Sequence, residues 1–299
     1  MAAGMPNKSE QRLAYGLLTP ALLVILVTVF VPLVMTLIDS LKYYNLLDLS
    51  RGMPFIGLEN YTKLLVNPDF WASLSRTIYF TIVSLVLELV IGIALAVLLN
   101  SPFRGRWFLR TIIIIPWAVP TIVNGAMWRW ILNPDYGVLN AVLLRFHLIS
   151  AYHSWLGNPR TAMDMIVVAD AWKMIPLVTM LLLASLQLIP EDVYEASAVD
   201  GAGRLRSFFA ITLPQLKNAI LVVLVIRTID SVKVFDIIYA MTGGGPADST
   251  LPIAYLAYNT TFNQLFISRG AAAAYLIAMV TLVFTIVYSR LLRAEGGKK

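Results

Sequence analysis

Six long apolar runs dominate this chain and leave few folds open to it. The runs cover residues 13–38, 74–99, 109–132, 162–188, 216–240 and 271–292. Each run reaches the roughly 20 residues that a helix needs to cross a hydrocarbon core of about 30 Å. In lipid, only helices and closed barrels satisfy all of their backbone hydrogen bonds, and runs of this length favour helices. We therefore expect an all-α polytopic membrane protein with six transmembrane helices, forming a single domain over residues 1–299.

The composition agrees with this class. Hydrophobic residues make up 59% of the chain and charged residues 13%, whereas soluble domains carry roughly 25% charged residues. The chain has no cysteine and two histidines, His147 and His153, so we expect no disulfide, no thiol nucleophile and no metal site. A cleaved signal peptide is a competing interpretation of residues 13–38. That run is too long and no A-x-A-like site follows it, so we expect an uncleaved span.

The Lys and Arg residues outside the runs indicate the orientation. With six spans both termini lie on one side, which holds Lys8, Arg12, Arg104, Arg106, Arg110, Arg204, Arg206, Lys217, Arg290, Arg293, Lys298 and Lys299. The opposite side holds Lys42, Arg51, Lys63, Arg76, Arg145, Arg160 and Arg269. Because cytoplasmic loops are enriched in Lys and Arg, this asymmetry predicts cytoplasmic N- and C-termini. The short basic turn at residues 104–110 is expected to bind anionic headgroups of membrane lipid.

One polar segment, residues 191–214, interrupts the apolar runs on the cytoplasmic side and reads EDVYEASAVDGAGRLRSFFAITLP. The two acidic residues that follow Pro190 suit the first turn of a short helix, where the helix dipole favours them. Gly201 suits a left-handed helix end, and we expect a second short helix over about residues 204–212. Pro214 fits a first-turn proline of the next span. This geometry leaves two interpretations open: a helical hairpin that docks another protein, or an amphipathic linker that lies on lipid headgroups.

The residues of this segment resemble the EAA loop of ABC importer permeases. Glu195-Ala196-Ser197, Gly201 and Ile211-x-Leu213-Pro214 match the spacing of that family's pattern, E-A-A-x3-G-x9-I-x-L-P. Ser197, which replaces the second alanine of the pattern, is the one departure. The resemblance implies a coupling helix that sits in a groove of a cytoplasmic ATPase subunit. The residues that it assigns to that interface are Glu191, Glu195, Ala196, Ser197, Asp200, Gly201, Ala202, Leu213 and Pro214.

Two other stretches resemble the carbohydrate-uptake group of this family, which includes the maltose, trehalose, lactose and glycerol-phosphate permeases. They are residues 55–61 (FIGLENY), and Phe235-Asp236 followed by residues 242–246 (TGGGP). The resemblance covers nearly the whole chain and implies the type I ABC importer permease fold in the cytoplasmic (inner) membrane of a bacterium or archaeon. The partners that it implies are a second homologous permease in a heterodimer, two cytoplasmic ABC ATPase subunits, an extracytoplasmic solute-binding protein and a carbohydrate.

The chain has no nucleotide-binding motif of its own. It lacks the G-x-x-x-x-G-K-[ST] sequence that cradles nucleotide phosphates. If ATP drives transport, ATP and Mg bind on a partner ATPase. We therefore expect a transport subunit and not an enzyme, with no cofactor on this chain and no nucleic-acid partner.

Eight ionisable residues fall inside the expected spans: Glu88, Arg129, Asp170, Lys173, Arg227, Asp230, Lys233 and Asp236. If all faced lipid, they would cost roughly 2.5–3.5 kcal/mol each and about 20 kcal/mol together, so they must pair, line water or lie shallower. We place Asp236 near the outer interface. For Glu88 and Arg129 two alternatives stand, a bridge between spans two and three or contact with the solute.

Helical spacing predicts which of these residues share a surface. Asp170, Lys173, Met174 and Leu177 lie on one face of span four, and Arg227, Asp230, Ser231 and Val234 on one face of span five. Together these faces combine charged, hydroxyl and apolar groups, which a sugar requires, and we expect them to line a substrate pathway. The alternative is a set of ion pairs within each helix, Asp170–Lys173 and Arg227–Asp230, that only stabilise the bundle.

The function that this sequence favours is the permease subunit of a binding-protein-dependent ABC importer for an oligosaccharide or disaccharide, working by alternating access. A permease for a phosphorylated polyol or another anionic solute is an alternative, since Lys173 and Arg227 could hold an anionic group. An ion-coupled secondary transporter is a second alternative, motivated by the intramembrane carboxylates of Asp170 and Asp230. An intramembrane enzyme is disfavoured, because the chain has no G-x-S-x-G motif and no histidine-based constellation.

Overall fold

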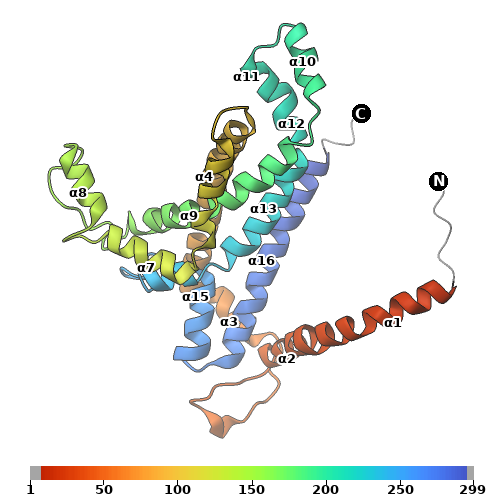
Figure 1. The fold of residues 1–299 in the computed structure, drawn as a ribbon. Coiled ribbons are helices and arrows are strands. Elements are labelled where there is room, and N and C mark those ends of the chain that lie inside the picture. Colours follow the sequence, from red (N-terminus) through yellow and green to blue (C-terminus); the bar gives the residue numbers. More distant parts are fainter. Residues whose placement is uncertain (1–7, 295–299) are drawn as a thin grey trace. The chain divides into compact units, whose positions relative to one another are not determined.

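The computed structural model describes residues 8–294, which are helical almost throughout (Figure 1). Over that range the only β pairing is an isolated bridge between Lys42 and Phe55. The helices are α1 (Lys8–Ile25), α2 (Val31–Ser40), α3 (Glu59–Val66), α4 (Pro68–Asn100), α5 (Arg106–Ile113), α6 (Ile115–Ala118), α7 (Thr121–Ile131), α8 (Val138–Arg145), α9 (Ala162–Leu186), α10 (Glu191–Val199), α11 (Arg204–Ser207), α12 (Leu213–Gln215), α13 (Lys217–Val232), α14 (Asp236–Met241), α15 (Ile253–Tyr258) and α16 (Ile267–Ala294). Short π-helical turns occur at Leu26–Phe30, Phe208–Thr212 and Asn259–Asn263, and a 3-10 turn at Leu49–Arg51.

The chain divides into two compact units, of which the first comprises Met1–Val66 and Ala257–Tyr275. Its longest apolar helix runs from Tyr15 to Ser40 through α1, the first π-helical turn and α2, and no residue of its most apolar window is buried. The hydroxyls of Thr19, Thr28 and Thr36 each donate a hydrogen bond to the carbonyl four residues earlier. These bonds satisfy the hydroxyls within the helix, so the whole surface of the helix is compatible with lipid.

The loop after α2 explains part of the FIGLENY motif. Asn60 is buried and donates from Nδ2 to the carbonyls of Ser40 and Lys42, at 2.8 Å each. The hydroxyl of Tyr61 lies 2.7 Å from the Ser40 hydroxyl. These two residues of the motif therefore fix the end of α2 to the start of α3.

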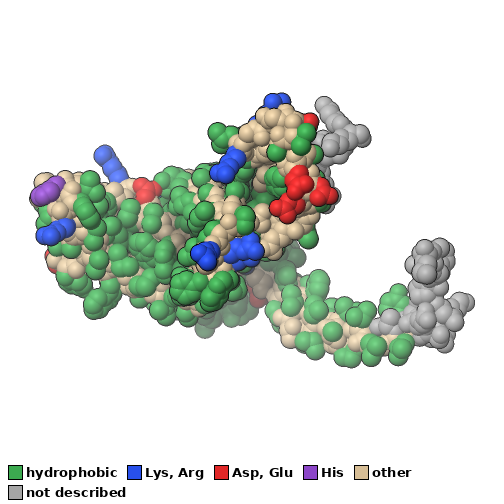
Figure 2. Space-filling view, turned by 45° about the horizontal axis from the view of Figure 1, so that its top comes forward, with side chains coloured by type: hydrophobic (Ala, Val, Ile, Leu, Met, Phe, Trp, Pro, Cys, Tyr) green, Lys and Arg blue, Asp and Glu red, His purple; other side chains and the backbone are tan. Residues whose placement is uncertain are grey.

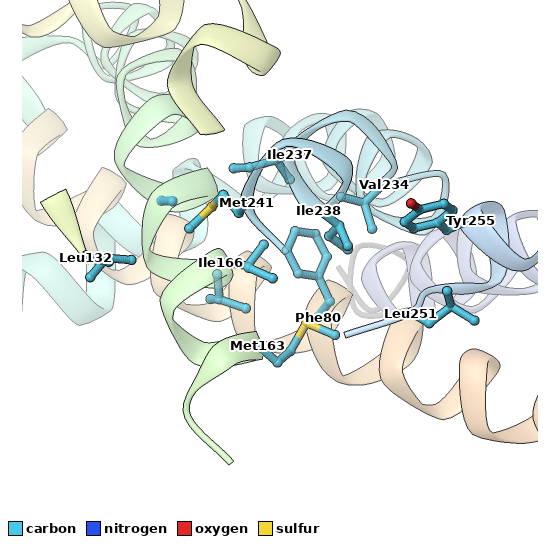
Figure 3. Packing of buried hydrophobic residues seen from close by; sticks show 12 residues of the cluster. Phe80, Leu132, Met163, Ile166, Val234, Ile237, Ile238, Met241, Leu251 and Tyr255 are labelled. Atoms are coloured by element: carbon cyan, nitrogen blue, oxygen red, sulfur yellow. The ribbon is translucent and has the colours of Figure 1, made fainter. Parts of the chain in front are cut away.

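The second unit, Asn67–Leu256 with Leu276–Lys299, is organised around α4, α9 and α13 (Figure 1). At one end Phe80 of α4 shares an apolar cluster with Ile166 of α9, and Figure 3 shows its ring beside Ile166 and Ile238. At the other end Leu99 of α4 shares a cluster with Leu182 of α9, so the two helices run parallel. Leu216, just before α13, belongs to the Leu99 cluster and Val234, just after it, to the Phe80 cluster. Helix α13 therefore runs in the opposite direction, as a chain that crosses a membrane back and forth requires.

The buried face of α4 carries small and polar side chains. They recur every three or four residues: Ser73, Thr77, Thr81, Ser84, Glu88, Gly92 and Ala96. Small residues let membrane helices approach closely. A Cβ atom at Gly92 would lie 2.7 Å from Cγ1 of Val178 on α9, so the seam between α4 and α9 depends on the absence of a side chain at this position.

Two of the expected spans are not single straight helices. Residues 109–132 form α5, α6 and α7, with a bend of 95° between Arg106–Ala118 and Thr121–Ile131. Val119 precedes Pro120 and has an extended ψ of 128°, because a proline disfavours the helical conformation of the residue before it. The last expected residues of span five, up to 240, also differ: α13 ends at Val232, and α14 begins only at Asp236.

Helix α13 is bent at its other end as well, by 60° from Arg204–Gln215. Within the described residues, four helices are long and apolar enough to cross a membrane, and six spans result if each bent pair counts as one. Five of these six helical segments overlap the expected runs over most of their length. The sixth, Arg204–Gln215 with Lys217–Val232, differs from the expected run 216–240, because it includes the second half of the 191–214 segment and ends at Val232.

The close approach at Gly92 gives the first testable prediction. Gly92→Ala places a methyl group 2.7 Å from Val178, and such overpacking lowers the free energy of unfolding by about 1–3 kcal/mol. Gly16→Ala is the matched control, since Gly16 is also helical and nothing lies within 4 Å of its added Cβ. The measurement is the thermal unfolding midpoint of the detergent-purified protein. Equal midpoints for the two variants would contradict the packing of α4 against α9.

Candidate functional site

A buried ion network joins the three central helices of the second unit. Arg227 of α13 donates from Nε and Nη2 to the two carboxylate oxygens of Glu88 on α4, at 2.7 Å each. Its Nη2 also donates to Oδ2 of Asp170 on α9 at 2.9 Å. Glu88 is 0% exposed, Arg227 2% and Asp170 8%. A bidentate pair this deeply buried fixes the relative positions of the helices, because separating the charges would leave them without solvation.

This network corrects two of the pairings considered from the sequence. The Glu88–Arg129 bridge is wrong, because Glu88 binds Arg227 and the Arg129 side chain is exposed. The Asp170–Lys173 pair within α9 is also wrong, since Asp170 binds Arg227 and Nζ of Lys173 has only a long contact, 3.9 Å, to the sulfur of Met174. The Arg227–Asp230 pair does occur, at 3.8 Å between Nη1 and Oδ2. Helical periodicity placed these charged residues on one face of each helix, but it did not show which helix supplies the ion-pair partner.

A cavity of about 340 Å³ opens beside this network, within the ~300–1,000 Å³ range of small-molecule sites. Of the eight residues expected to form a substrate pathway, its lining includes Asp170, Lys173, Met174, Arg227, Asp230, Ser231 and Val234, but not Leu177. The residues that the sequence did not assign to it are Phe80, Thr121, Lys233, Phe235, Asp236 and Ile237.

Asp236 and Lys233 line this cavity because the helix breaks between them. The expectation that Asp236 lies near the outer interface assumed a continuous helix to residue 240. In the structure α13 ends at Val232 and α14 begins at Asp236, so the intervening residues turn and both charged side chains border the cavity. Non-helical backbone at membrane depth is tolerated where it lines a cavity. In the sequence, the two charged residues Lys233 and Asp236 close together within an apolar run were the feature that could have indicated this break.

The charges around the cavity balance. Its lining holds three carboxylates, of Asp170, Asp230 and Asp236, and three cationic groups, of Lys173, Arg227 and Lys233. Arg227 is fully engaged with Glu88 and Asp170, and Lys233 lies 3.8 Å from Asp230. Lys173 forms no ion pair among the described residues. The cavity therefore presents several hydrogen-bond acceptors and an unpaired ammonium group, without a strong excess of either charge.

Aromatic rings border the same region. Phe235 lines the cavity and stacks on Tyr239, with 5.6 Å between ring centroids and an interplanar angle of 20°. It also meets the edge of Tyr255 at 5.1 Å. Trp172, next to Lys173 in the sequence, packs edge-on against Trp128 at 6.2 Å and does not line the cavity.

The 191–214 segment folds as a short helical hairpin. Gly201 lies two residues after the end of α10, and its φ of +76° is the left-handed conformation expected there. The chain then returns through α11, the π-helical turn and α12. The hydroxyls of Ser197 and Ser207 lie 2.8 Å apart, and those of Tyr194 and Thr212 lie 3.1 Å apart. Ser197, the one departure from the EAA pattern, is thus a buried residue that joins the two arms.

The exposed surface of this hairpin carries acidic and apolar side chains and, on α11, the exposed basic residues Arg204 and Arg206. Acidic side chains gather on it (Figure 2), and Glu191, Asp192 and Glu195 are all exposed. Val199 is 89% exposed and Leu205 78%. Of the residues assigned to the ATPase interface, Ser197 is buried and Ala202 and Leu213 are half-buried, while Glu191, Glu195, Ala196, Asp200, Gly201 and Pro214 are exposed.

A metal centre has no counterpart in this site. Within residues 8–294 no three His, Asp or Glu side chains come together in a way that could hold a metal ion. The cavity carboxylates instead face basic side chains.

A helical membrane chain with a charge-balanced internal cavity and an exposed hairpin between α9 and α13 has the architecture of a solute-transport subunit. The chain belongs to the family described as binding-protein-dependent transport system inner membrane component, which matches residues 88–294. Members of this family are transport components, which confirms the expectation of a permease subunit and not an enzyme. Its family also places it in the inner membrane.

Relatives of known designation match over almost the whole chain. The trehalose/maltose transport system permease protein MalF of Thermococcus litoralis is 42% identical, covering 93% of each chain. The sulfoquinovosyl glycerol transport system permease protein SmoG of Agrobacterium fabrum is 37% identical over 96% of this chain and 92% of that protein. The trehalose transport system permease protein SugA of Mycobacterium tuberculosis is 32% identical over 97% and 92%.

A solved structure confirms the fold. A chain of a bacterial ABC transporter involved in the import of the acidic polysaccharide alginate matches with a TM-score of 0.82 and 23% identity, covering 97% of this chain and 98% of that one. The all-α, type I ABC importer permease fold expected from the sequence is therefore correct.

The ion network gives the second testable prediction. Arg227→Met leaves the Glu88 and Asp170 carboxylates buried together without a cation, and breaking a buried pair in this way costs about 3–5 kcal/mol. Glu88→Gln should lower the stability less, because Arg227 keeps its ion pair with Asp170. Lys233→Met is the control, since its pair with Asp230 is exposed and contributes at most about 1 kcal/mol. Thermal stability of the purified variants tests this order, and an Arg227→Met protein as stable as Lys233→Met would refute it.

Proposed function

We propose that this chain is the permease subunit of an ABC importer for a carbohydrate. The solute is an oligosaccharide or disaccharide, and the importer works by alternating access. The observation that carries the proposal is the cavity between α9 and α13, the two helices that lead into and out of the 191–214 hairpin. A movement of the hairpin acts on both walls of that cavity.

The chemistry of the cavity suits a carbohydrate. Sugar hydroxyls need charged or polar partners, which Lys173, Asp230, Ser231 and Asp236 can supply, and the ring of Phe235 offers an apolar face. The balance of charges favours a neutral solute, because a phosphate ester would require a clear excess of basic groups. Relatives named for trehalose/maltose and for trehalose support the same substrate class.

We propose that the exposed face of the hairpin docks on a cytoplasmic ABC ATPase subunit. The four exposed acidic residues of the hairpin, Glu191, Asp192, Glu195 and Asp200, outnumber its two exposed basic residues, Arg204 and Arg206. Anionic headgroups would therefore repel the hairpin as a whole, and a protein partner fits it better than a lipid surface. ATP and Mg would bind on two such ATPase subunits. An extracytoplasmic solute-binding protein would deliver the carbohydrate, consistent with the description of the family.

We further propose that residues 1–299 form one permease domain with six spans, cytoplasmic termini and a cytoplasmic hairpin. The parallel direction of α4 and α9 and the opposite direction of α13 support this topology, and the Lys and Arg distribution supports the orientation. A second homologous permease would complete the pathway as a heterodimer in the membrane of a bacterium or archaeon.

The two other transport mechanisms have less support. A permease for a phosphorylated polyol relies on Lys173 and Arg227 to hold the anionic group, but Arg227 is engaged with two carboxylates, which leaves Lys173 as the one cation of that pair without an ion pair among the described residues. An ion-coupled secondary transporter relies on the carboxylates of Asp170 and Asp230, but Asp170 is bound to Arg227, and Asp230 lies 3.8 Å from both Arg227 and Lys233. Uptake by the purified chain alone, driven by an ion gradient in liposomes, would restore the second mechanism.

A third prediction tests the hairpin. Gly201→Val puts a β-branched residue at a φ of +76°, where the strain of roughly 1–2 kcal/mol distorts the turn. We expect solute uptake per ATP hydrolysed to fall about tenfold in proteoliposomes containing the complete transporter. The control is Gly203→Ala, where φ is −70° and nothing lies within 4 Å. Wild-type coupling in Gly201→Val would count against the ATPase-docking role.

A fourth prediction tests the cavity. Neutral disaccharides, but not glycerol phosphate, should stimulate the ATPase activity of the complete transporter. Lys173→Met removes a charged hydrogen-bond donor and should raise the solute concentration for half-maximal stimulation about tenfold or more. Arg129→Met is the matched control, because Arg129 lies outside the cavity. Stimulation by glycerol phosphate alone would favour the anionic-solute permease.

A further inference from the structure

A second cavity, of about 230 Å³, lies at the N-terminal ends of α4 and α9. It shares no residue with the cavity described above. Helix α4 contributes Ser75, Arg76 and Tyr79, and the loop before α9 contributes Pro159 and Arg160. The first turn of α9 contributes Met163 and Asp164, and Ser249 completes the wall. In the proposed topology this is the outer end of both helices.

The polar groups of this second cavity suit a singly charged oxyanion. Neither Arg76 nor Arg160 forms an ion pair among the described residues, while Asp164 accepts a hydrogen bond from the Tyr79 hydroxyl. Two guanidinium groups and one carboxylate give the cavity a net charge of about +1. The Ser249 hydroxyl oxygen is buried and has no hydrogen-bond partner. Arginine forks bind phosphate oxygens with two parallel hydrogen bonds.

An exposed apolar stripe leads away from this cavity along α4. Ser75 and Tyr79 lie at its start, and Ile82, Val86 and Val90 continue it at intervals of three or four residues, all exposed. Helix α4 has 33 residues and is about 50 Å long, roughly 20 Å more than the hydrocarbon core. If the excess is shared between its ends, the core begins about seven residues into the helix, close to Ser75. The cavity then lies at headgroup level, and the stripe lies along the acyl chains.

We propose that this cavity binds the phosphodiester of an anionic phospholipid, with an acyl chain against the stripe of α4. A free phosphate would satisfy the arginines but would leave the stripe without a role. A zwitterionic phosphatidylcholine would bring a cation toward a cavity that is already positive. The site would fix the outer ends of α4 and α9, the two helices that hold Glu88 and Asp170.

The test is native mass spectrometry of the full-length chain in its assembled transporter, from nanodiscs of phosphatidylcholine with a minority of phosphatidylglycerol. The wild type should retain phosphatidylglycerol selectively, and the double variant Arg76→Gln/Arg160→Gln should lose it about tenfold or more. Arg145→Gln is the control, since this exposed arginine lies outside the cavity and its loss should leave retention unchanged. Equal loss in the control would show a general charge effect and would overturn the proposal.

A second variant keeps the proposal testable if the double variant does not fold. Asp164→Asn raises the net charge of the cavity and should increase the retention of phosphatidylglycerol. Three results would overturn the proposal: equal retention of phosphatidylcholine, displacement of the lipid by added inorganic phosphate, and no retained phosphatidylglycerol in the wild type. The second would identify a site for a free anion, and the third would show that another subunit covers the stripe.

Discussion

The buried guanidinium of Arg227 is the interaction on which the central three helices depend. Its bonds to Glu88 and Asp170 connect α13 to α4 and α9 through three buried side chains. An arginine can do this where a lysine cannot, because its planar fork binds one carboxylate with two hydrogen bonds and still reaches a second. The network does not have to be more stabilising than an apolar core. The network instead fixes one relative position of the three helices. Apolar helix faces alone tolerate sliding of one helix along another, whereas paired charges do not.

The same network is continuous with the cavity. Asp230 lies one helical turn beyond Arg227 and pairs on its other side with Lys233. A row of alternating charges thus runs from the fully buried Glu88 to the exposed Lys233. Two of the three helix interruptions meet this cavity, since Thr121 directly follows the bend at Pro120 and Asp236 directly follows the break after α13. The interrupted helices therefore place polar groups in the cavity from their ends. A straight helix at the same depth would offer only the side chains along its length.

The sequence predicts the helical class and the turn of the hairpin, because each depends on local rules. Run length sets the spans, and Gly201 sets the turn between α10 and α11. The pairing of Glu88 with Arg227 was out of reach, since 139 residues separate them and periodicity says nothing about which helices are neighbours. The 95° bend was missed for a different reason: apolarity continues through residues 109–132 although Pro120 ends one helix there. Ser197 is the one departure from the EAA pattern, and its hydroxyl joins the two arms of the hairpin, which the pattern alone does not indicate.

In the proposed importer, these contacts determine how a displacement of the hairpin can travel. The hairpin arms are joined by two hydroxyl pairs, so a force on α10 is shared with α11 and α12 and reaches α13 through the 60° bend at its start. Helix α13 could respond by sliding past α4 and α9, but that would separate Arg227 from both carboxylates at a cost of several kcal/mol. Bending at the two ends of α13 breaks no such pair, because Leu216 and residues 233–235 are already outside regular helix. The least costly response is therefore for α4, α9 and α13 to move as one body while the two ends of α13 act as hinges. The second of these hinges is the segment that carries Lys233 and Phe235 into the cavity wall.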